Sequence, residues 1–399
     1  MKRMIAILLF LVMALPMAGC AQEEVTVPDI QNIYQFDIPD NEAMAFLKKL
    51  GVGWNLGNTF DAIKQGWNAN ADEMTLETSW CGVMTTPEIF QLLKEAGYGV
   101  VRIPVSWHDH VSGPDHAISD RWMNRVQEVV DYALDAGLYV ILNIHHDEDQ
   151  FLPTAAHYAE SAHYIECVWK QIAARFRDYD DHLIMESMNE PRVLYTDYEW
   201  VFDANNPGCV EAADCLNKLN QLFVDTVRAD GGCNADRYLM VPGYDAAPAG
   251  VLTDLFQLPA DTADNRIIVS AHAYTPYNFA LQEGGVSKFS LYGASQTSEI
   301  AQFMNGLYNK FIANGIPAII GEFGARDKKN LQDRVDFAAW YTAAASARNL
   351  PCLWWDNNAA KGNGELFCIL NRAKCEFLYP QIVEAMIRYA GYDAMPAKE

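Results

Sequence analysis

The sequence has little positive charge for its length. Its 399 residues include 29 lysines and arginines against 52 aspartates and glutamates, which gives a formal net charge of −23 at pH 7. A chain this acidic repels the phosphates of nucleic acids and the headgroups of anionic membranes. We therefore expect no nucleic-acid partner and no binding to an anionic membrane surface, and the charge suits a neutral substrate.

The sequence also lacks the ligand spacing of a metal site. It has nine cysteines but no CxxC pair and no cluster of cysteine with histidine, which structural zinc sites require. His145 and His146 are adjacent, but neighbouring side chains of a strand point to opposite faces. No third or fourth ligand is evident beside them, so we expect no metal.

The apolar run at the N-terminus is too short for a membrane span. Lys2 and Arg3 precede it, and it ends in Met17-Ala18-Gly19-Cys20. This order is typical of a signal peptide over residues 1–20, and the small residues before Cys20 resemble a bacterial lipobox. We expect an exported protein that carries a lipid on Cys20, anchored at the outer membrane or cell surface or in the periplasm. Without the lipid it would be secreted.

Eight cysteines remain beyond Cys20, and an exported protein can oxidise them. Two pairs are close in sequence and lie in loop-like stretches, Cys209 with Cys215 and Cys368 with Cys375. Both pairs are candidate disulfides. The full connectivity does not follow from the sequence.

The chain is organised as one long series of buried strands. After a short tether over residues 21–39, eight apolar runs follow without a linker, and they define one domain over residues 40–399. The runs are 52–56, 99–105, 139–145, 183–188, 238–241, 267–272, 318–323 and 352–355.

Helical patterns separate most of these strands. Thr86 and Pro87 begin one that stops at Gly97, Ser119 opens the next, and a third covers 216–227. Eight buried strands alternating with helices indicate a single (β/α)8 barrel. The alternative is a doubly wound sheet, which needs a glycine-rich phosphate turn after its first strand, and the glycines there have the wrong spacing.

Polar residues gather where the predicted strands end. In such a barrel the active site lies at the carboxyl ends of the strands. The residues at those ends are Asn58, Arg102 with Trp107, His145 with His146, Asn189 with Glu190, His272 with Tyr274, Glu322, and Trp355. They would therefore face one opening.

Two of these residues are glutamates at the ends of apolar runs, Glu190 and Glu322. A buried carboxylate is costly unless it is paired or used. A pair of carboxylates facing one cleft is the machinery of glycoside hydrolysis. The alternative interpretation is that Glu190 and Glu322 are buried glutamates that form structural ion pairs.

Seven motifs in order resemble glycoside hydrolase family 5, and most closely its bacterial endoglucanase branch, subfamily 4. The resemblance covers residues 41–390. The motifs are Gly53-Trp54-Asn55-Leu56-Gly57-Asn58, Val101-Arg102-Ile103-Pro104, Asn143-Ile144-His145-His146, Asn189-Glu190-Pro191, His272-Ala273-Tyr274, Gly321-Glu322-Phe323-Gly324 and Trp355-Asp356-Asn357.

The resemblance implies that Glu190 is the general acid/base and that Glu322 is the nucleophile of a retaining double displacement. Such carboxyls stand about 5–5.5 Å apart, and at that distance one should hold a proton. Arg102 would keep Glu322 ionised, and Tyr274 would orient it. Asn189 would bind the sugar 2-hydroxyl.

The remaining polar and aromatic residues are expected to support the site or bind the sugar. His145 and His272 would hold hydroxyls and the catalytic carboxyls, and Trp355 is the family's platform under the central sugar. Further candidates for substrate binding are Asn58, His146, Trp54, Trp80 and Trp107, although core or loop packing is an equal alternative for the last three. Trp122, Trp169 and Trp340 lie in helical patterns and are predicted to be core.

The function expected is a retaining endo-β-1,4-glucanase that needs no cofactor and acts as a monomer. Its partner would be a β-glucan polysaccharide: cellulose-like glucan, mixed-linkage β-glucan or xyloglucan. A xyloglucan-specific enzyme and a mannanase or xylanase of the same family stay open. The alternative from another class is a non-catalytic glycan-binding lipoprotein, which would have to lack a catalytic residue.

Overall fold

Eight parallel strands close into a barrel in this computed structural model, which describes residues 24–66 and 70–398. The strands pair in chain order around the barrel, and β10 pairs with β1 to close it. They are β1 (Val52–Leu56), β2 (Val100–Ile103), β5 (Tyr139–Asn143), β6 (Leu183–Glu186), β7 (Leu239–Pro242), β8 (Ile267–His272), β9 (Ala318–Phe323) and β10 (Cys352–Asp356). The predicted barrel is confirmed, and the eight predicted strands match these in position.

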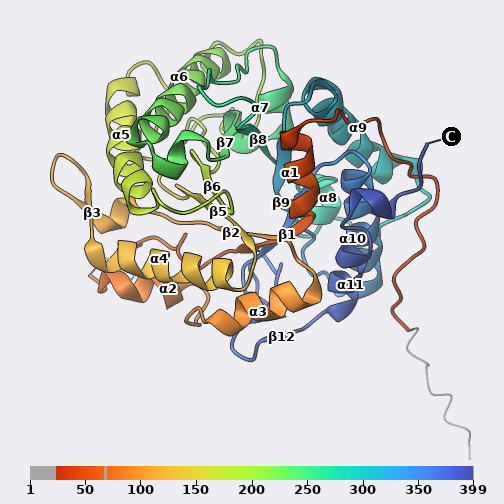
Figure 1. Ribbon diagram of the computed structural model, residues 1–399. Coiled ribbons are helices and arrows are strands. Elements are labelled where there is room, and N and C mark those ends of the chain that lie inside the picture. Colours follow the sequence, from red (N-terminus) through yellow and green to blue (C-terminus); the bar gives the residue numbers. More distant parts are fainter. Residues whose placement is uncertain (1–23, 67–69, 399) are drawn as a thin grey trace, which may run out of the picture.

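Helices surround the barrel on its outer side (Figure 1). The long ones are α3 (Pro87–Ala96), α4 (Asp120–Asp135), α5 (Tyr158–Arg175), α6 (Pro207–Asp230), α9 (Ala294–Lys310), α10 (Leu331–Ser346) and α11 (Pro380–Arg388). A further helix, α1 (Glu42–Leu50), precedes β1, and the short helices are α2 (Leu76–Ser79), α7 (Pro248–Leu252) and α8 (Tyr277–Ala280). Two small hairpins lie in loops: β3 (Val111–Ser112) with β4 (Ala117–Ile118), and β11 (Leu370–Asn371) with β12 (Glu376–Phe377).

The helix boundaries follow the capping residues. α3 has Pro87 in its first turn and ends at Gly97, whose φ of 108° is a left-handed conformation that favours glycine. α6 begins at Pro207, well before the predicted 216, because Asn206 caps it: the Asn206 side chain accepts from the amide of Gly208 at 2.8 Å. Trp122 and Trp169 are fully buried, as predicted, whereas Trp340 is only partly buried and packs against the core.

The N-terminal segment packs against the barrel rather than hanging free. Residues 24–39 contain no regular secondary structure, but Phe36 donates its amide to Ala347 O at 2.8 Å and Ile30 donates its amide to the Tyr389 hydroxyl at 2.9 Å. The described part of the predicted tether is therefore an attached strap. The predicted signal peptide and Cys20 lie outside the described residues. Within the described part of the chain, no helix has the length and apolar character to cross a bilayer.

All eight cysteines of the described residues are free, so neither candidate disulfide is present. Cys209 and Cys215 lie on the same continuous helix, α6. A separation of six residues along a helix is about 9 Å, beyond the reach of a disulfide. Cys368 and Cys375 instead direct their thiols to the backbone carbonyls of Leu370 and Arg372.

Candidate active site

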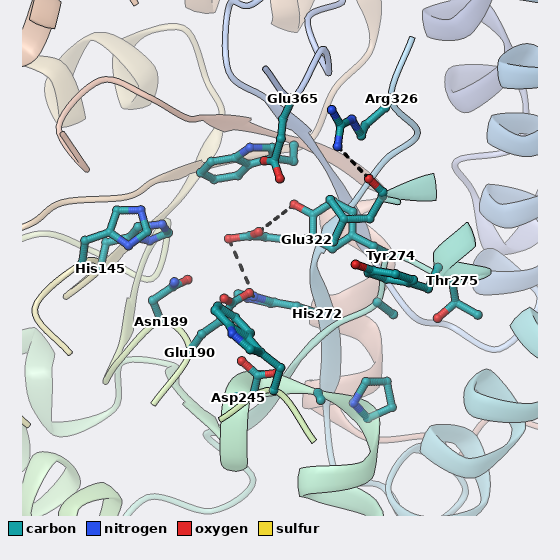
Figure 2. A pocket seen from close by; sticks show the side chains of 18 of the residues that line it. His145, Asn189, Glu190, Asp245, His272, Tyr274, Thr275, Glu322, Arg326 and Glu365 are labelled. Atoms are coloured by element: carbon teal, nitrogen blue, oxygen red, sulfur yellow. Dashed lines mark hydrogen bonds and ion pairs between the residues drawn. The ribbon is translucent and has the colours of Figure 1, made fainter. Parts of the chain in front are cut away.

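A cleft of about 1060 Å³ opens at the carboxyl ends of the barrel strands. Most of the predicted site residues line it, and several are seen together in Figure 2. The predicted residues that line it are Asn58, Trp80, His145, His146, Asn189, Glu190, His272, Tyr274, Glu322 and Trp355. The fold therefore brings predicted residues from six of the eight strand ends or their loops to one cleft.

The two glutamates face each other across this cleft. Glu190 follows β6, and Glu322 lies near the end of β9. One carboxylate oxygen of each residue and one ring nitrogen of His272 all lie within 4.8 Å of one another. This separation fits the short spacing of a retaining pair and leaves no room for the water that an inverting pair needs between its carboxyls.

Arg102 is the centre of a buried network beneath the cleft. Its Nε donates to Glu186 Oε2 and its Nη1 donates to Glu322 Oε1, both at 2.6 Å, and its Nη2 donates to Asn189 Oδ1 at 2.8 Å. Burial opposes ionisation of Arg102, but the charges of Glu186 and Glu322 outweigh it and raise the pKa of the guanidinium. Arg102 therefore stays charged and fixes both Glu322 and Asn189.

The second oxygen of Glu322 is held as well. The Tyr274 hydroxyl donates to Glu322 Oε2 at 2.8 Å, so the predicted contact is present. With Arg102 on one oxygen and Tyr274 on the other, the carboxylate is fixed in one orientation. A fixed carboxylate needs little reorganisation before it attacks a substrate.

We expect Arg102→Met to destabilise the protein by about 3–5 kcal/mol, because it leaves Glu186 and Glu322 buried without their cation. Arg102→Lys keeps the charge but not the fork of donors, so it should recover part of the stability and little of the activity. The free energy of unfolding in urea measures the first effect. An unchanged unfolding free energy in Arg102→Met would contradict the network.

His272 and Glu190 share one proton. His272 Nδ1 lies 2.8 Å from Glu190 Oε1. Burial opposes protonation of His272, but the Glu322 charge and the hydrogen bond to Glu190 raise its pKa. Burial alone would raise the pKa of Glu190, but the hydrogen bond from His272 lowers it. In the free protein the proton therefore sits on His272, within one hydrogen bond of Glu190.

This pair predicts how activity depends on pH. A residue that must deliver a proton loses its function as pH rises through the pKa of the group that stores it. Since the pKa of His272 is raised above its usual 6.5, we expect kcat/KM to stay high at pH 6.5 and to fall only at higher pH. A pH profile of kcat/KM checks this, with unfolding followed over the same range. If kcat/KM fell with a midpoint below pH 6.5 while the protein stayed folded, the assignment of the shared proton to His272 would be wrong.

The adjacent histidines differ in charge. Burial lowers the pKa of His145 well below its usual range, and Asn143 Nδ2 lies 3.2 Å from its Nδ1, so His145 is neutral with its other nitrogen free to donate. Burial opposes protonation of His146, but the hydrogen bond to Glu148 raises its pKa to about 9. His145 thus suits a sugar hydroxyl, and His146 brings a positive charge to the cleft.

Two groups of residues in the described chain have metal-ligand atoms close together at the cleft, Asp61 with His145 and His146, and Glu190 with His272 and Glu322. Asp61 already accepts backbone hydrogen bonds on both carboxylate oxygens, and the second group is bonded internally. Neither group offers a set of free ligand atoms for a cation. The absence of a metal stays a prediction.

The aromatic residues divide between cleft and core. Trp355 lines the cleft with its ring parallel to that of His145, 5.7 Å between centroids. The ring lies so close to Gly57 that a Cβ there would stand 2.7 Å from it. Trp80 also lines the cleft, from the end of α2.

Trp54 and Trp107 do not line the cleft, and the expectation that they bind substrate is corrected. Both are fully buried. Asn55 points into the barrel and donates to Gly321 O at 2.9 Å, so its neighbour Trp54 points outward, where it packs against the guanidinium of Arg372. Trp107 is held in the core by its Nε1, which donates to Asn143 O at 3.0 Å.

Several site residues were missed in the sequence. Glu186 ends β6 and binds Arg102, but it reads as part of an apolar run. The others come from loops, where no periodicity marks them. The residues between the barrel strands and the long helices that line the cleft include Trp200, Asp245, Tyr277 at the start of α8, Arg326 and Glu365.

A (β/α)8 barrel that fixes two facing glutamates with an arginine, a tyrosine and a histidine defines a glycoside hydrolase. The chain belongs to glycosyl hydrolase family 5, since the cellulase model of that family matches residues 64–361. This confirms the resemblance seen in the motifs.

Known relatives agree over most of the chain. Endoglucanase 1 of Ruminococcus albus is 40% identical over 381 residues, which are 96% of this chain and 89% of the relative. A family 5 lichenase structure from Caldicellulosiruptor sp. F32 is 51% identical, with a TM-score of 0.90 over 92% of this chain and 100% of the lichenase. A subfamily 4 broad-specificity endoglucanase from Ruminococcus champanellensis is 44% identical, with a TM-score of 0.82 over 88% of this chain and 100% of that enzyme. The protein is a glycoside hydrolase of the endoglucanase type.

Proposed function

We propose that the protein is a retaining endo-β-1,4-glucanase that cuts internal bonds of cellulose-like glucan, mixed-linkage β-glucan and xyloglucan. The observation that carries this proposal is the geometry of Glu190 and Glu322: two close carboxyls, one fixed by Arg102 and Tyr274 and the other supplied with a proton by His272. Each glutamate therefore has a separate role.

The reaction has two displacements. The Glu322 carboxylate attacks the anomeric carbon while Glu190 passes the proton that it takes from His272 to the glycosidic oxygen, so that bond breaks and a glycosyl ester forms. Glu190 then takes a proton from water as the water attacks the same carbon, which releases the sugar and restores Glu322. Asn189 Oδ1 is occupied by Arg102, which leaves the Asn189 amide NH₂ to donate to the 2-hydroxyl.

The choice of glucan is supported by the relatives. A mutant of the related lichenase was solved with cellotetraose, and the Ruminococcus champanellensis endoglucanase with cellotriose. A xyloglucan-specific enzyme, or a mannanase or xylanase, would share the same catalytic groups and differ in the loops. A binding protein without activity is disfavoured because Glu190, Glu322 and Arg102 are all present and connected.

A substrate panel tests the proposal. Barley β-glucan, carboxymethylcellulose, xyloglucan, glucomannan and xylan are incubated with the protein, and the products are separated by size. We expect mixed oligosaccharides early in the reaction on the first three substrates. Activity confined to glucomannan or xylan would overturn the proposed substrate, and release of a single short product from the start would overturn endo action.

We also propose that the protein is exported and anchored by a lipid on Cys20, and that it acts as a monomer. The residues before Cys20 support the anchor. Metabolic labelling with a fatty acid in a bacterial host tests it, with Cys20→Ser as the control. Equal labelling of both forms would overturn the anchor, and light scattering tests the monomer.

A further inference from the structure

Asp245 places a further carboxyl in the cleft wall, beside Glu190, that the reaction described so far does not use. It follows β7 and lines the cleft, and Figure 2 shows it next to Glu190 on the side away from Glu365. Its Oδ1 is closed off from solvent and has no hydrogen-bond partner among the described residues. The carboxyl therefore meets the cleft through Oδ2.

The backbone holds Asp245 in a strained position. Asp245 has φ 55° and ψ 18°, and Ala246 has φ 46°, so two consecutive residues with side chains lie in the left-handed region. Such a conformation costs about 1–2 kcal/mol per residue and persists only where the surroundings impose it. The Asp245 amide donates to Pro191 O at 2.8 Å, which ties it to the residue after Glu190. The backbone of Asp245 is therefore fixed relative to the segment that carries the acid/base.

The groups around Asp245 favour its neutral form. Glu190, Glu148 and Glu199 all repel its charge. The cation that acts on Asp245, Arg192, is already committed to Glu148 at 3.1 Å, to Glu199 at 3.5 Å and to the Glu190 carbonyl at 2.8 Å. Burial and the charge of Glu190 raise the pKa of Asp245 to about 9, so at neutral pH it is a carboxylic acid with one donor and one acceptor.

We propose that Asp245 donates a hydrogen bond to a hydroxyl of the leaving-group sugar and so determines which sugar is accepted there. This rests on the proposed function, in which Glu190 protonates the glycosidic oxygen, so the departing sugar lies on the Glu190 side of the cleft. A neutral acid suits a sugar hydroxyl because each has a donor and an acceptor. A charged carboxylate at this position would instead oppose ionisation of Glu190 during catalysis.

The test compares a leaving group that is a sugar with one that is not. kcat/KM is measured on cellotetraose and on an aryl cellobioside for the wild type, Asp245→Ala and Asp245→Asn. We expect Asp245→Ala to lose about tenfold more on cellotetraose than on the aryl substrate, the effect of one hydrogen bond. Asp245→Asn keeps a donor and an acceptor and tolerates the left-handed backbone, so its ratio of the two rates should stay near that of the wild type.

A pH series adds a readout that a structural role would not move. As pH rises through about 9, Asp245 ionises and loses its donor. On cellotetraose, kcat/KM of the wild type should therefore fall to that of Asp245→Ala, while kcat/KM of Asp245→Asn should stay above it. Equal losses of Asp245→Ala on both substrates, or equal losses of the Asn and Ala variants on cellotetraose, would overturn the role of Asp245 alone. A wild type inactive on cellotetraose would overturn the proposed function as well.

Discussion

Glu322→Gln is expected to lose activity on β-glucan by on the order of 10⁴-fold, equivalent to about 5.5 kcal/mol of transition-state stabilisation. Glutamine has the shape of glutamate: its one oxygen can still accept from Arg102, and its NH₂ can donate to the Tyr274 hydroxyl, so the cleft should keep its form. It cannot form the glycosyl ester. Release of reducing ends measures the loss. Glu384→Gln, the same change at an exposed position of α11, is the matched control and should keep wild-type activity.

Chemical rescue separates a lost nucleophile from a damaged site. With Glu322→Gly and an activated aryl glycoside, added azide should restore turnover and give the α-glycosyl azide, because azide attacks from the face that Glu322 occupied. A β-glycosyl azide, or wild-type rates in Glu322→Gln, would contradict the assignment.

Glu190→Ala is expected to have the second largest effect, and the size should depend on the leaving group. Its general-acid contribution of about 10²–10⁴-fold should be lost on β-glucan, whose leaving sugar needs a proton. An aryl glycoside with an acidic phenol leaves without that help, so the first displacement should be little affected. The second displacement also loses its base, so the glycosyl-enzyme should accumulate and give a burst of phenol. Glu384→Ala serves as the control.

The comparison of the two substrates decides the role of Glu190. Equal losses on β-glucan and on the activated aryl glycoside would mean that Glu190 supports the structure or the binding of substrate instead. If Glu190→Ala turned over the aryl glycoside at the wild-type rate and without a burst of phenol, the base of the second displacement would be another residue.

The barrel could be predicted because its strands are buried on both faces. Continuous apolar runs such as β8 and β9, separated by capped helices, leave few other folds. Strand ends then located Glu190, Glu322 and His272, since residues at the carboxyl ends of parallel strands share one opening. The contact of Tyr274 with Glu322 was expected from the resemblance to the family.

The remaining features depend on the direction of side chains or on loop conformation. Trp54 was misplaced because a run buried on both faces gives no alternation to tell inward from outward positions. Asp245 was missed because its position depends on two left-handed residues, one of them an alanine. The attachment of residues 24–39 leaves no pattern in the sequence, because it depends on partners far along the chain such as Tyr389.

The central claim is that Glu322 becomes covalently bound to the sugar, and trapping tests it directly. The fluorine of a 2-deoxy-2-fluoro cellobioside slows both displacements. A good leaving group still lets the first displacement proceed, so the glycosyl-enzyme accumulates. Peptide mass spectrometry of the inactivated protein should find one fluorinated disaccharide on the peptide that contains Glu322. A label on Glu190, or turnover of β-glucan that gives the inverted anomer as first product, would contradict the account.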